Sequence, residues 1–324
     1  MPTVLVTGAA GNLGGLLARS LAGTDVALRL MVHRTPLPPD LLAAPNVAAV
    51  RADLAEPKTL GPAVDGADVV VHFAGVLFAP RPERFLPETN TRWFGNLLDA
   101  CLAAGVGRVV LISFPHVEGP TSPDRPAAGR LDGSPVSVHA RTRLEEERLL
   151  FARTAGTATT PVVLRVGMVY GPGILMIEAA RWLAERRLLA VWPEPTGIHL
   201  VATADFLAAT KAAALKEGVR GTYHVGDEGR VTLQEFLDAA CEAWGLDAPR
   251  RLPAWVVLSG AALCEAAALL LGTRSPLTRD FVRIGRVPYF GDTTRFRREL
   301  VPRLVHPTVR SGIRTLRGAR SGPA

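Results

Sequence analysis

Three glycines near the start of the chain have a spacing that suits phosphate binding. In TVLVTGAAGNLGG, residues 3–15, an apolar run ends at a glycine turn and a helical leucine pattern follows. Glycine lets the chain turn sharply and approach a ligand closely, and the free N–H groups of a helix's first turn attract anions. This order predicts a site for the pyrophosphate of a dinucleotide, lined by Gly8, Gly11, Asn12, Leu13 and Gly14. The spacing is G-x-x-G-x-x-G instead of the commoner G-x-G-x-x-G, and an ordinary strand–helix turn is the alternative.

A second group of candidate ligands follows the next apolar run, residues 26–32. About twenty residues past such glycines, an acidic side chain would bind the ribose 2′-hydroxyl of NAD. This chain has His33 and Arg34 there. Arginine can instead hold a 2′-phosphate through charge-assisted hydrogen bonds. We therefore expect NADP(H) as the cofactor, while the alternative for Arg34 is a solvated strand end.

A parallel sheet is needed to bring these residues together. Apolar runs at residues 46–52, 68–73, 108–113, 162–166 and 222–225 alternate with helical patterns at 83–104, 138–155, 177–186 and 205–214. Such alternation predicts an α/β fold, whose ligands bind at the carboxyl ends of the strands. We expect a Rossmann-type doubly wound parallel sheet in residues 1–166, completed by strand 222–226. Residues 167–324 should form mainly a smaller, largely helical substrate domain.

Further cofactor candidates lie at the ends of these predicted strands and on one helix. Most of them are small or polar residues, and the others are next to such residues in the sequence. They lie where a cofactor would cross the edge of the sheet. The segment at residues 118–137 is rich in proline and glycine, which is typical of a long loop beside a site. The predicted residues are Asp53, Leu54, Ala74, Gly75, Asn90, Val166, Gly167 and Val169.

The composition limits the classes of function. The chain has 324 residues and a net charge of +7, but only three of its basic residues are lysines and no basic run is interleaved with aromatics. Nucleic-acid binding is therefore not expected. The three cysteines, Cys101, Cys241 and Cys264, have no metal-type spacing. With a strand predicted from Thr3, they favour a cytoplasmic protein without a signal peptide or a metal.

One segment, residues 254–272, is apolar enough to be considered for a membrane. It contains Glu265, which would lie within the apolar layer of a bilayer. We expect a buried helix, or a wall of an apolar cavity, and no membrane span.

The motifs along nearly the whole chain resemble the extended, or atypical, short-chain dehydrogenase/reductase family. The resemblance implies a Rossmann core, a C-terminal substrate domain and a nicotinamide cofactor between them. The residues that carry it are the glycine turn, Asp53-Leu54, HFAG at 72–75, Asn90, Gly95-Asn96, Arg165, YGPG at 170–173, Asp205, YHVG at 223–226, Thr232 and Glu235.

The catalytic positions implied by the resemblance depart from the family pattern. The family's Tyr-x-x-x-Lys is replaced by His139 and Arg143, and Phe114 follows Ser113 where the family's last serine stands. Ser113, His139 and Arg143 are thus the candidate catalytic residues. Arg143 shares a helix face with His139 and can bind ribose hydroxyls, but a guanidinium stays protonated. An imidazole can supply a proton but is shorter than tyrosine, so we expect His139 not to be the obligatory donor. The alternative is that His139 has inherited the tyrosine's role.

Loss of the Tyr/Lys pair favours an NADPH-dependent ketoreductase whose substrate assists its own reduction. A quinone or hydroxyaryl ketone would spread the developing charge into a phenolate, which reduces the need for a protein donor. This pattern is similar to the atypical polyketide ketoreductases of the angucyclinone type. Ordinary core packing is the alternative for each residue predicted to line the substrate site: Val76, Leu77, Phe78, Phe114, Pro115, His116, Ile174, Leu175 and Met176.

Two other functions remain open at this point. A sugar-nucleotide epimerase or dehydratase oxidises an unactivated alcohol and needs a general base, which the missing tyrosine makes less favourable. A non-catalytic NADP-sensing regulator or complex subunit needs no donor. We expect the partner to be a small-molecule substrate, a large polyketide- or quinone-like aromatic compound, and the oligomeric state to be a monomer or homodimer.

Overall fold

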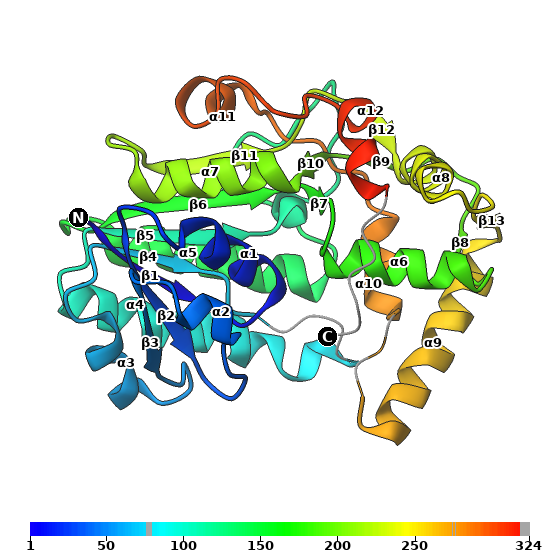
Figure 1. Ribbon diagram of the computed structural model, residues 1–324. Coiled ribbons are helices and arrows are strands. Elements are labelled where there is room, and N and C mark those ends of the chain that lie inside the picture. Colours follow the sequence, from blue (N-terminus) through cyan, green and yellow to red (C-terminus); the bar gives the residue numbers. More distant parts are fainter. Residues whose placement is uncertain (76–79, 274, 276, 318–324) are drawn as a thin grey trace.

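The structure is a computed structural model, and it describes residues 1–75, 80–273, 275 and 277–317. Seven parallel strands form its central sheet in the order β11-β6-β5-β4-β1-β2-β3 (Figure 1). The chain runs outward from β1 to β3 and then returns to β4 beside β1, which places a topological switch point between β1 and β4. The strands are β1 (Thr3–Thr7), β2 (Ala27–Val32), β3 (Val47–Arg51), β4 (Val69–His72), β5 (Arg108–Ser113), β6 (Thr160–Val166) and β11 (Gly221–Val225).

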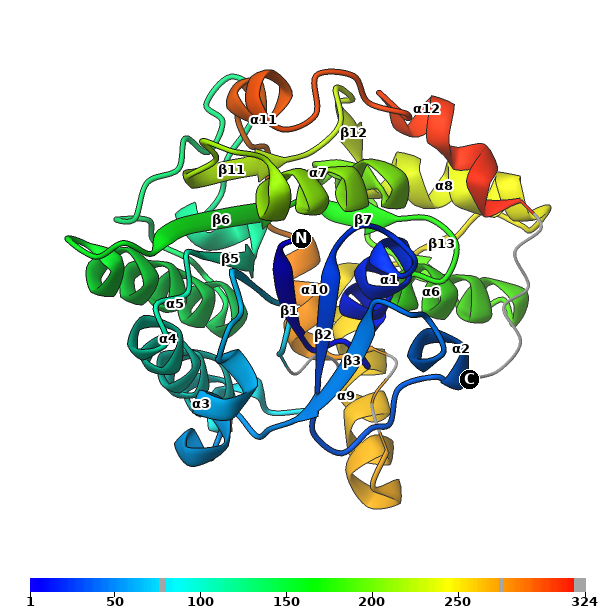
Figure 2. The ribbon, with the colours of Figure 1, turned by 60° about the vertical axis from the view of Figure 1, so that its left-hand side comes forward.

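Helices cover both faces of this sheet, which confirms the predicted doubly wound α/β fold (Figure 2). Side chains alternate along a strand, so Val4 and Val6 enter one apolar cluster and Leu5 enters the other. The first cluster includes residues of α1 (Asn12–Leu21) and α7 (Thr203–Leu215). The second includes residues of α3 (Pro57–Val64), α4 (Trp93–Ala103) and α5 (Val138–Thr154). The short α2 (Pro39–Leu42) lies beside β3.

The C-terminal half is mainly helical and shares the first apolar cluster with the sheet. Tyr170, Trp192 and Phe236 belong to that cluster, so the two halves are packed together without a polar boundary. Short strands connect its helices: β7 (Met168–Tyr170), β8 (Ala190–Val191), β9 (Gly197–Ile198), β10 (Leu200–Ala202), β12 (Val231–Thr232) and β13 (Arg250–Arg251). Its helices are α6 (Leu175–Glu185), α8 (Leu233–Trp244), α9 (Ala254–Leu271), α10 (Arg279–Gly285), α11 (Thr294–Glu299) and α12 (Val309–Gly312).

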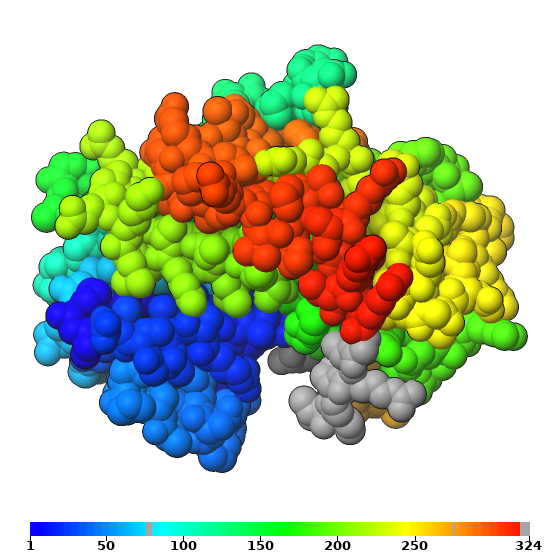
Figure 3. All heavy atoms as spheres, turned by 45° about the horizontal axis from the view of Figure 1, so that its top comes forward, coloured from blue at the N-terminus to red at the C-terminus, as the bar shows by residue number. Residues whose placement is uncertain are grey.

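The last part of the described chain lies over the outer helices. Figure 3 shows the orange and red segment lying across α7 and reaching the yellow α8. Val305 N and His306 N donate to the buried Asp205 of α7, at 2.6 and 2.9 Å. This carboxylate therefore fixes the segment that leads to α12.

The helical pattern predicted at residues 83–104 is not one regular helix. It consists of a 3₁₀ turn (Pro82–Arg84), a π-helical turn (Pro87–Arg92) and then α4. Single π turns within helices occur frequently at functional sites. Here the π turn carries Asn90, a predicted cofactor ligand, so the irregularity falls at the site.

The expectation of a buried helix at residues 254–272 is wrong. Helix α9 covers Ala254–Leu271, but its buried residues are confined to one stripe of Val257, Ala261, Glu265 and Ala268. The rest of the helix lies at the surface of the C-terminal half, where it projects away from the body (Figure 1). Periodicity could not reveal this, because the exposed positions are as apolar as the buried ones.

Candidate functional site

The glycine turn has the geometry predicted for a phosphate cradle. Gly8 adopts a left-handed φ of 68°, and Gly11 N donates to Gly8 O at 2.8 Å. A Cβ added to Gly8 would lie 2.9 Å from Ala74 N, and one added to Gly14 would overlap the Gly8 carbonyl oxygen. Helix α1 has no side-chain cap and no acidic residue in its first turn. Its first N–H groups are thus left for an anion, and the residues fit the pyrophosphate of a dinucleotide.

Beneath this turn, Thr7 and His72 join the ends of the two strands at the switch point. Thr7 Oγ1 hydrogen-bonds His72 Nδ1 at 2.8 Å, and the backbone N–H groups of Phe73 and Ala74 reach the same hydroxyl at 3.3 Å. Burial, and secondarily the charge of Arg143, lower the pKa of His72 to about 3, so its imidazole is neutral. Thr7 and His72 were not predicted as site residues, because their role depends on the pairing of β1 with β4.

Asn12 has a different role from a direct phosphate ligand. Its Nδ2 donates to Gly173 O at 2.5 Å, and its Oδ1 accepts from Leu175 N at 2.9 Å. Both side-chain groups therefore tie the glycine turn to the start of α6. This connection holds the Rossmann half and the C-terminal half together above the sheet edge.

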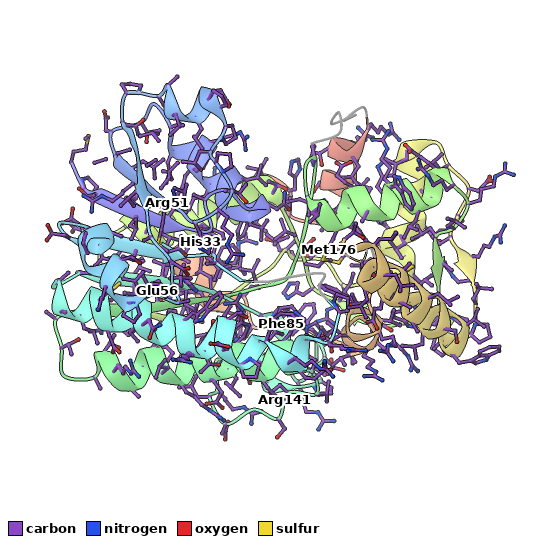
Figure 4. All side chains as sticks on the ribbon, turned by 90° about the horizontal axis from the view of Figure 1, so that it is seen from below. His33, Arg51, Glu56, Phe85, Arg141 and Met176 are labelled. Carbon is purple, nitrogen blue, oxygen red and sulfur yellow. The ribbon has the colours of Figure 1, made fainter. Side chains whose placement is uncertain are left out.

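His33 and Arg34, the residues predicted to bind a 2′-phosphate, follow the end of β2. An arginine that was not predicted, Arg51, lies beside them. His33 Nε2 lies 2.9 Å from Asp53 Oδ2, while Arg34 is exposed. Val32 pairs in register with Arg51 of β3, so a second exposed arginine ends beside this pair. Figure 4 shows His33, Arg51 and Glu56 in the same region of the Rossmann half. Only the strand register could have identified Arg51, because it lies 17 positions from Arg34 in the sequence.

Arg143 lies against the exposed Gly75 at the end of β4. A Cβ at Gly75 would overlap Nη2 of Arg143 and would lie 3.9 Å from Asn90 Oδ1. Asn90 Nδ2 donates to Thr142 Oγ1 at 3.0 Å, but its Oδ1 is buried without a hydrogen-bond partner among the described residues. Arg143 Nη1 donates to Glu146 Oε2 at 2.7 Å. A guanidinium and an unpartnered amide oxygen beside a glycine fit the hydroxyls of a ribose.

Ser113, at the end of β5, belongs to a buried ionic network. Its hydroxyl donates to Glu147 Oε1, and Arg165 donates to the carboxylates of both Glu147 and Glu118. The side chains of Arg165, Glu118 and Glu147 are at most 1% exposed. Burial alone would lower the pKa of Arg165, but the charges of Glu147 and Glu118 and the hydrogen bond to Glu147 raise it, so the guanidinium stays charged. The Ser113 hydroxyl is occupied within the network.

The same network holds the predicted loop at residues 118–137. Glu118 accepts from the backbone N–H groups of Gly129 and Arg130 at 2.7 and 3.0 Å. The network thus fixes this loop against the sheet. Glu118 was not predicted, and its position just after a strand end was the only sequence signal for it.

His139 is tied to the C-terminal half. Its Nδ1 donates to Oδ2 of Asp280 on α10 at 2.6 Å, and the ring lies 5.8 Å from that of Phe281. The side chain is 9% exposed, and Nε2 is buried without a hydrogen-bond partner among the described residues. Asp280 was missed because it lies 141 positions away in the sequence.

The described residues that were predicted to line the substrate site follow the ends of β5 and β7 in the sequence. Pro115 and Ile174 are buried, while Phe114, His116 and Met176 are partly exposed. The ring of His116 lies 5.2 Å from that of Phe114, its Nε2 donates to Val287 O at 3.1 Å, and burial lowers its pKa to about 4. In Figure 4, Met176 of α6 lies across the boundary of the two halves from Phe85 and Arg141. Val76, Leu77 and Phe78 lie outside the described residues.

The remaining predicted residues lie along the same edge. Val166 and Val169 are buried around Gly167, whose Cβ would lie 2.5 Å from the carbonyl oxygen of His199. Leu54 O accepts from Asn96 Nδ2 at 2.8 Å, and Leu13 is partly buried in the first turn of α1. No group of three or more metal-ligating side chains occurs among the residues that the structure describes.

Comparison with known proteins identifies the family. The NAD dependent epimerase/dehydratase family matches residues 4–191, more than half of the chain, and the chain belongs to this family of extended short-chain dehydrogenase/reductases. A 2-alkyl-3-oxoalkanoate reductase of Stenotrophomonas maltophilia is 28% identical over 98% of both chains. A ceramide reductase of Caulobacter vibrioides is 29% identical over 84% of this chain and 80% of its own.

A solved structure with the same fold is the UDP-glucose 4-epimerase of Thermotoga maritima, with a TM-score of 0.76, 15% identity and 97% of each chain covered. Family and relatives together define an NAD(P)-dependent enzyme of the oxidoreductase type. They give no specific support for a likeness to angucyclinone ketoreductases.

Proposed function

We propose that this protein is an NADPH-dependent ketoreductase that reduces a carbonyl group of a substrate with a large apolar body. The observation that carries the proposal is the state of the three family catalytic positions. Ser113 donates to Glu147, His139 Nδ1 donates to Asp280, and Arg143 pairs with Glu146. The site retains cofactor-binding geometry while each of these groups has an internal partner.

Cofactor binding is assigned to the residues that fit it. The first turn of α1 would hold the pyrophosphate, and Arg143 with Asn90 would hold the ribose next to the nicotinamide, which supplies the hydride. Arg34 and Arg51 favour NADP(H), because both are exposed cations at adjacent strand ends. Asp53 is the carboxylate near these two arginines, and His33 pairs with it, so its oxygen is engaged by the imidazole.

In the proposed reaction the substrate, and not a protein side chain, accommodates the negative charge that hydride transfer creates. Hydride transfer to an isolated ketone creates an alkoxide, which a protein donor must protonate or bind. The Ser113 hydroxyl donates to Glu147, and the Nε2 atom of His139 is buried. A quinone that accepts the hydride becomes a phenolate directly. In a hydroxyaryl ketone, the neighbouring phenol can give its proton to the new alkoxide and become the phenolate, since a phenol titrates near pH 10, far below an alcohol. We propose such an aromatic substrate.

Long-chain alkyl ketones are a second substrate class, favoured by the names of two relatives. The relatives are a reductase of 2-alkyl-3-oxoalkanoates and a ceramide reductase. Phe114, Ile174 and Met176 would pack equally well against an alkyl chain or an aromatic ring. An epimerase or dehydratase reaction is less favoured, because it requires a base at position 139 to oxidise an alcohol.

The test measures NADPH oxidation by absorbance with matched substrates. Hydroxyaryl ketones with a free phenol should be reduced at least about 10-fold faster than their methyl ethers, and simple aliphatic ketones should react least. Equal rates for the free and methylated compounds would contradict substrate assistance. Reduction confined to 2-alkyl-3-oxo acids would select the second class. NADPH binding without reduction of any ketone would instead support a regulator.

A further inference from the structure

Helix α9 presents an apolar surface that the other described residues leave uncovered. Trp255, Leu263, Leu270 and Leu271 are 70, 72, 87 and 74% exposed. The charged residue within the helix is Glu265, and it faces inward. Exposed apolar surfaces of this kind mark sites of association with proteins or membranes.

The inward stripe shows how the helix is attached. Val257, Ala261, Glu265 and Ala268 recur every three or four positions and face the body of the protein. Glu265 accepts from Arg279 N at 2.8 Å and from Arg279 Nε at 2.7 Å, at the start of α10. A helix of 18 residues is long enough to approach the thickness of a bilayer core. Crossing the bilayer would require breaking this ion pair and separating α9 from α10, so the helix is built to lie at a surface.

The charges around α9 favour an anionic surface. Residues 250–286 contain six arginines and two acidic residues, a net charge of +4 out of +7 for the whole chain. The two acids, Glu265 and Asp280, are held by Arg279 and His139. Arg250, Arg283 and Arg286 are exposed and have no carboxylate partner in the part of the chain that the structure describes.

We propose that α9 docks the protein on anionic lipid membranes, with Leu269–Leu271 and Trp255 entering the interfacial layer and the flanking arginines contacting the headgroups. Tryptophan and leucine on an apolar helix beside basic residues are the combination that binds such interfaces. A second copy of the chain is a poorer occupant. A two-fold interface would pair the same arginine-rich region with itself, which is repulsive. The C-terminal part of α9 projects away from the body, which leaves the apolar side of the helix accessible (Figure 2).

The experiment is co-sedimentation of the full chain with vesicles of phosphatidylcholine containing about 30 mol% phosphatidylglycerol, at about 100 mM salt. We expect binding at least about 10-fold stronger than to phosphatidylcholine alone, and weakening at about 500 mM salt. The double variant Leu270→Glu/Leu271→Glu should bind at least about 10-fold more weakly than the wild type. Val305→Glu is the matched control, because Val305 is 64% exposed and belongs to the segment bound to Asp205 of α7.

Three results would overturn the proposal. They are a wild-type protein that stays in the supernatant, a double variant that binds as well as the wild type, and a lipid-free dimer that the double substitution converts into a monomer. NADPH binding by the double variant shows that it is folded. If it does not fold, brominated lipids in the same vesicles provide a second measurement. They should quench the fluorescence of the wild type more than that of Trp255→Phe, and equal quenching would count against docking.

Discussion

His139 Nδ1 lies 2.6 Å from Asp280 Oδ2, so the helix at the family's catalytic position is fastened to α10 of the C-terminal half. The contact occupies one ring nitrogen and leaves Nε2 buried. An imidazole held in this way connects two elements. We therefore expect the primary role of His139 to be the positioning of α10 beside the site.

We predict that His139→Asn remains active and loses less activity than the removal of an essential acid would cause. The amide Nδ2 of asparagine can take the place of Nδ1 and donate to Asp280, while the variant has no counterpart of Nε2. An essential acid contributes about 10²–10⁴ in rate. We therefore expect kcat to fall by less than about 10² and the melting temperature to stay near that of the wild type.

His139→Ala is the comparison for that prediction. It leaves Asp280 unpaired, and breaking such a partly buried pair should lower the melting temperature and raise KM more than His139→Asn does. A loss of about 10³ in kcat for His139→Asn, with NADPH binding intact, would show that Nε2 is the proton donor after all.

The two arginines at the strand ends should decide the cofactor. Hydrogen bonds to charged groups contribute about 1.5–3 kcal/mol, which corresponds to about 10- to 150-fold in affinity. Arg34→Ala and Arg51→Ala should each weaken NADPH binding by a factor in this range, and should change NADH binding little. Calorimetric titration of both cofactors measures this. Arg187→Ala, at an exposed arginine of the C-terminal half, is the control, and equal affinity of the wild type for NADPH and NADH would refute the preference.

Two helical glycines offer a matched test of the phosphate cradle. A Cβ at Gly14 would overlap the Gly8 carbonyl oxygen, whereas one at Gly61 of α3 would meet no atom within 4 Å. Gly14→Ala should distort the turn, weaken binding of either cofactor by at least about 10-fold and lower the melting temperature. Gly61→Ala should leave cofactor binding unchanged and stabilise the protein by about 0.5–1 kcal/mol. Equal cofactor affinities for the two variants would mean that the turn tolerates the added methyl group.

The sequence predicted the parts of the fold and site that depend on local patterns. Apolar runs ending in glycine or small residues identified the strands, and the positions of Gly8, Gly14 and Gly75 followed from them. The contacts of Arg51 and Asp280 were not predictable, because they depend on strand register and on the packing of α10. Composition was misleading for α9, since an apolar helix has the same sequence pattern whether it is buried or exposed.

Glu146 makes the stability of the protein dependent on pH. Its carboxyl group is fully buried, with Oε2 on Arg143 and Oε1 without a partner among the described residues. Burial raises its pKa to about 7, against the attraction of Arg143 and with a smaller contribution from the charge of Glu147. Because the pKa is higher in the folded state, the stabilising contribution is complete below the unfolded value of 4.5 and is lost as pH rises through about 7.

We therefore predict that Glu146→Gln removes the loss of folding stability that the wild type shows as pH rises through about 7. The shift of the pKa corresponds to an upper limit of about 3 kcal/mol, so the melting temperature of the variant relative to the wild type should rise by several degrees between pH 5 and pH 8.5. Thermal unfolding across this range measures the difference. Glu145→Gln is the control, because Glu145 is half exposed and pairs with Arg148 at the surface. If the melting temperatures of the wild type and Glu146→Gln change in parallel with pH, Arg143 keeps the buried carboxylate ionised throughout. The positive charge of Arg143 would then be balanced by Glu146 at every pH at which the cofactor binds.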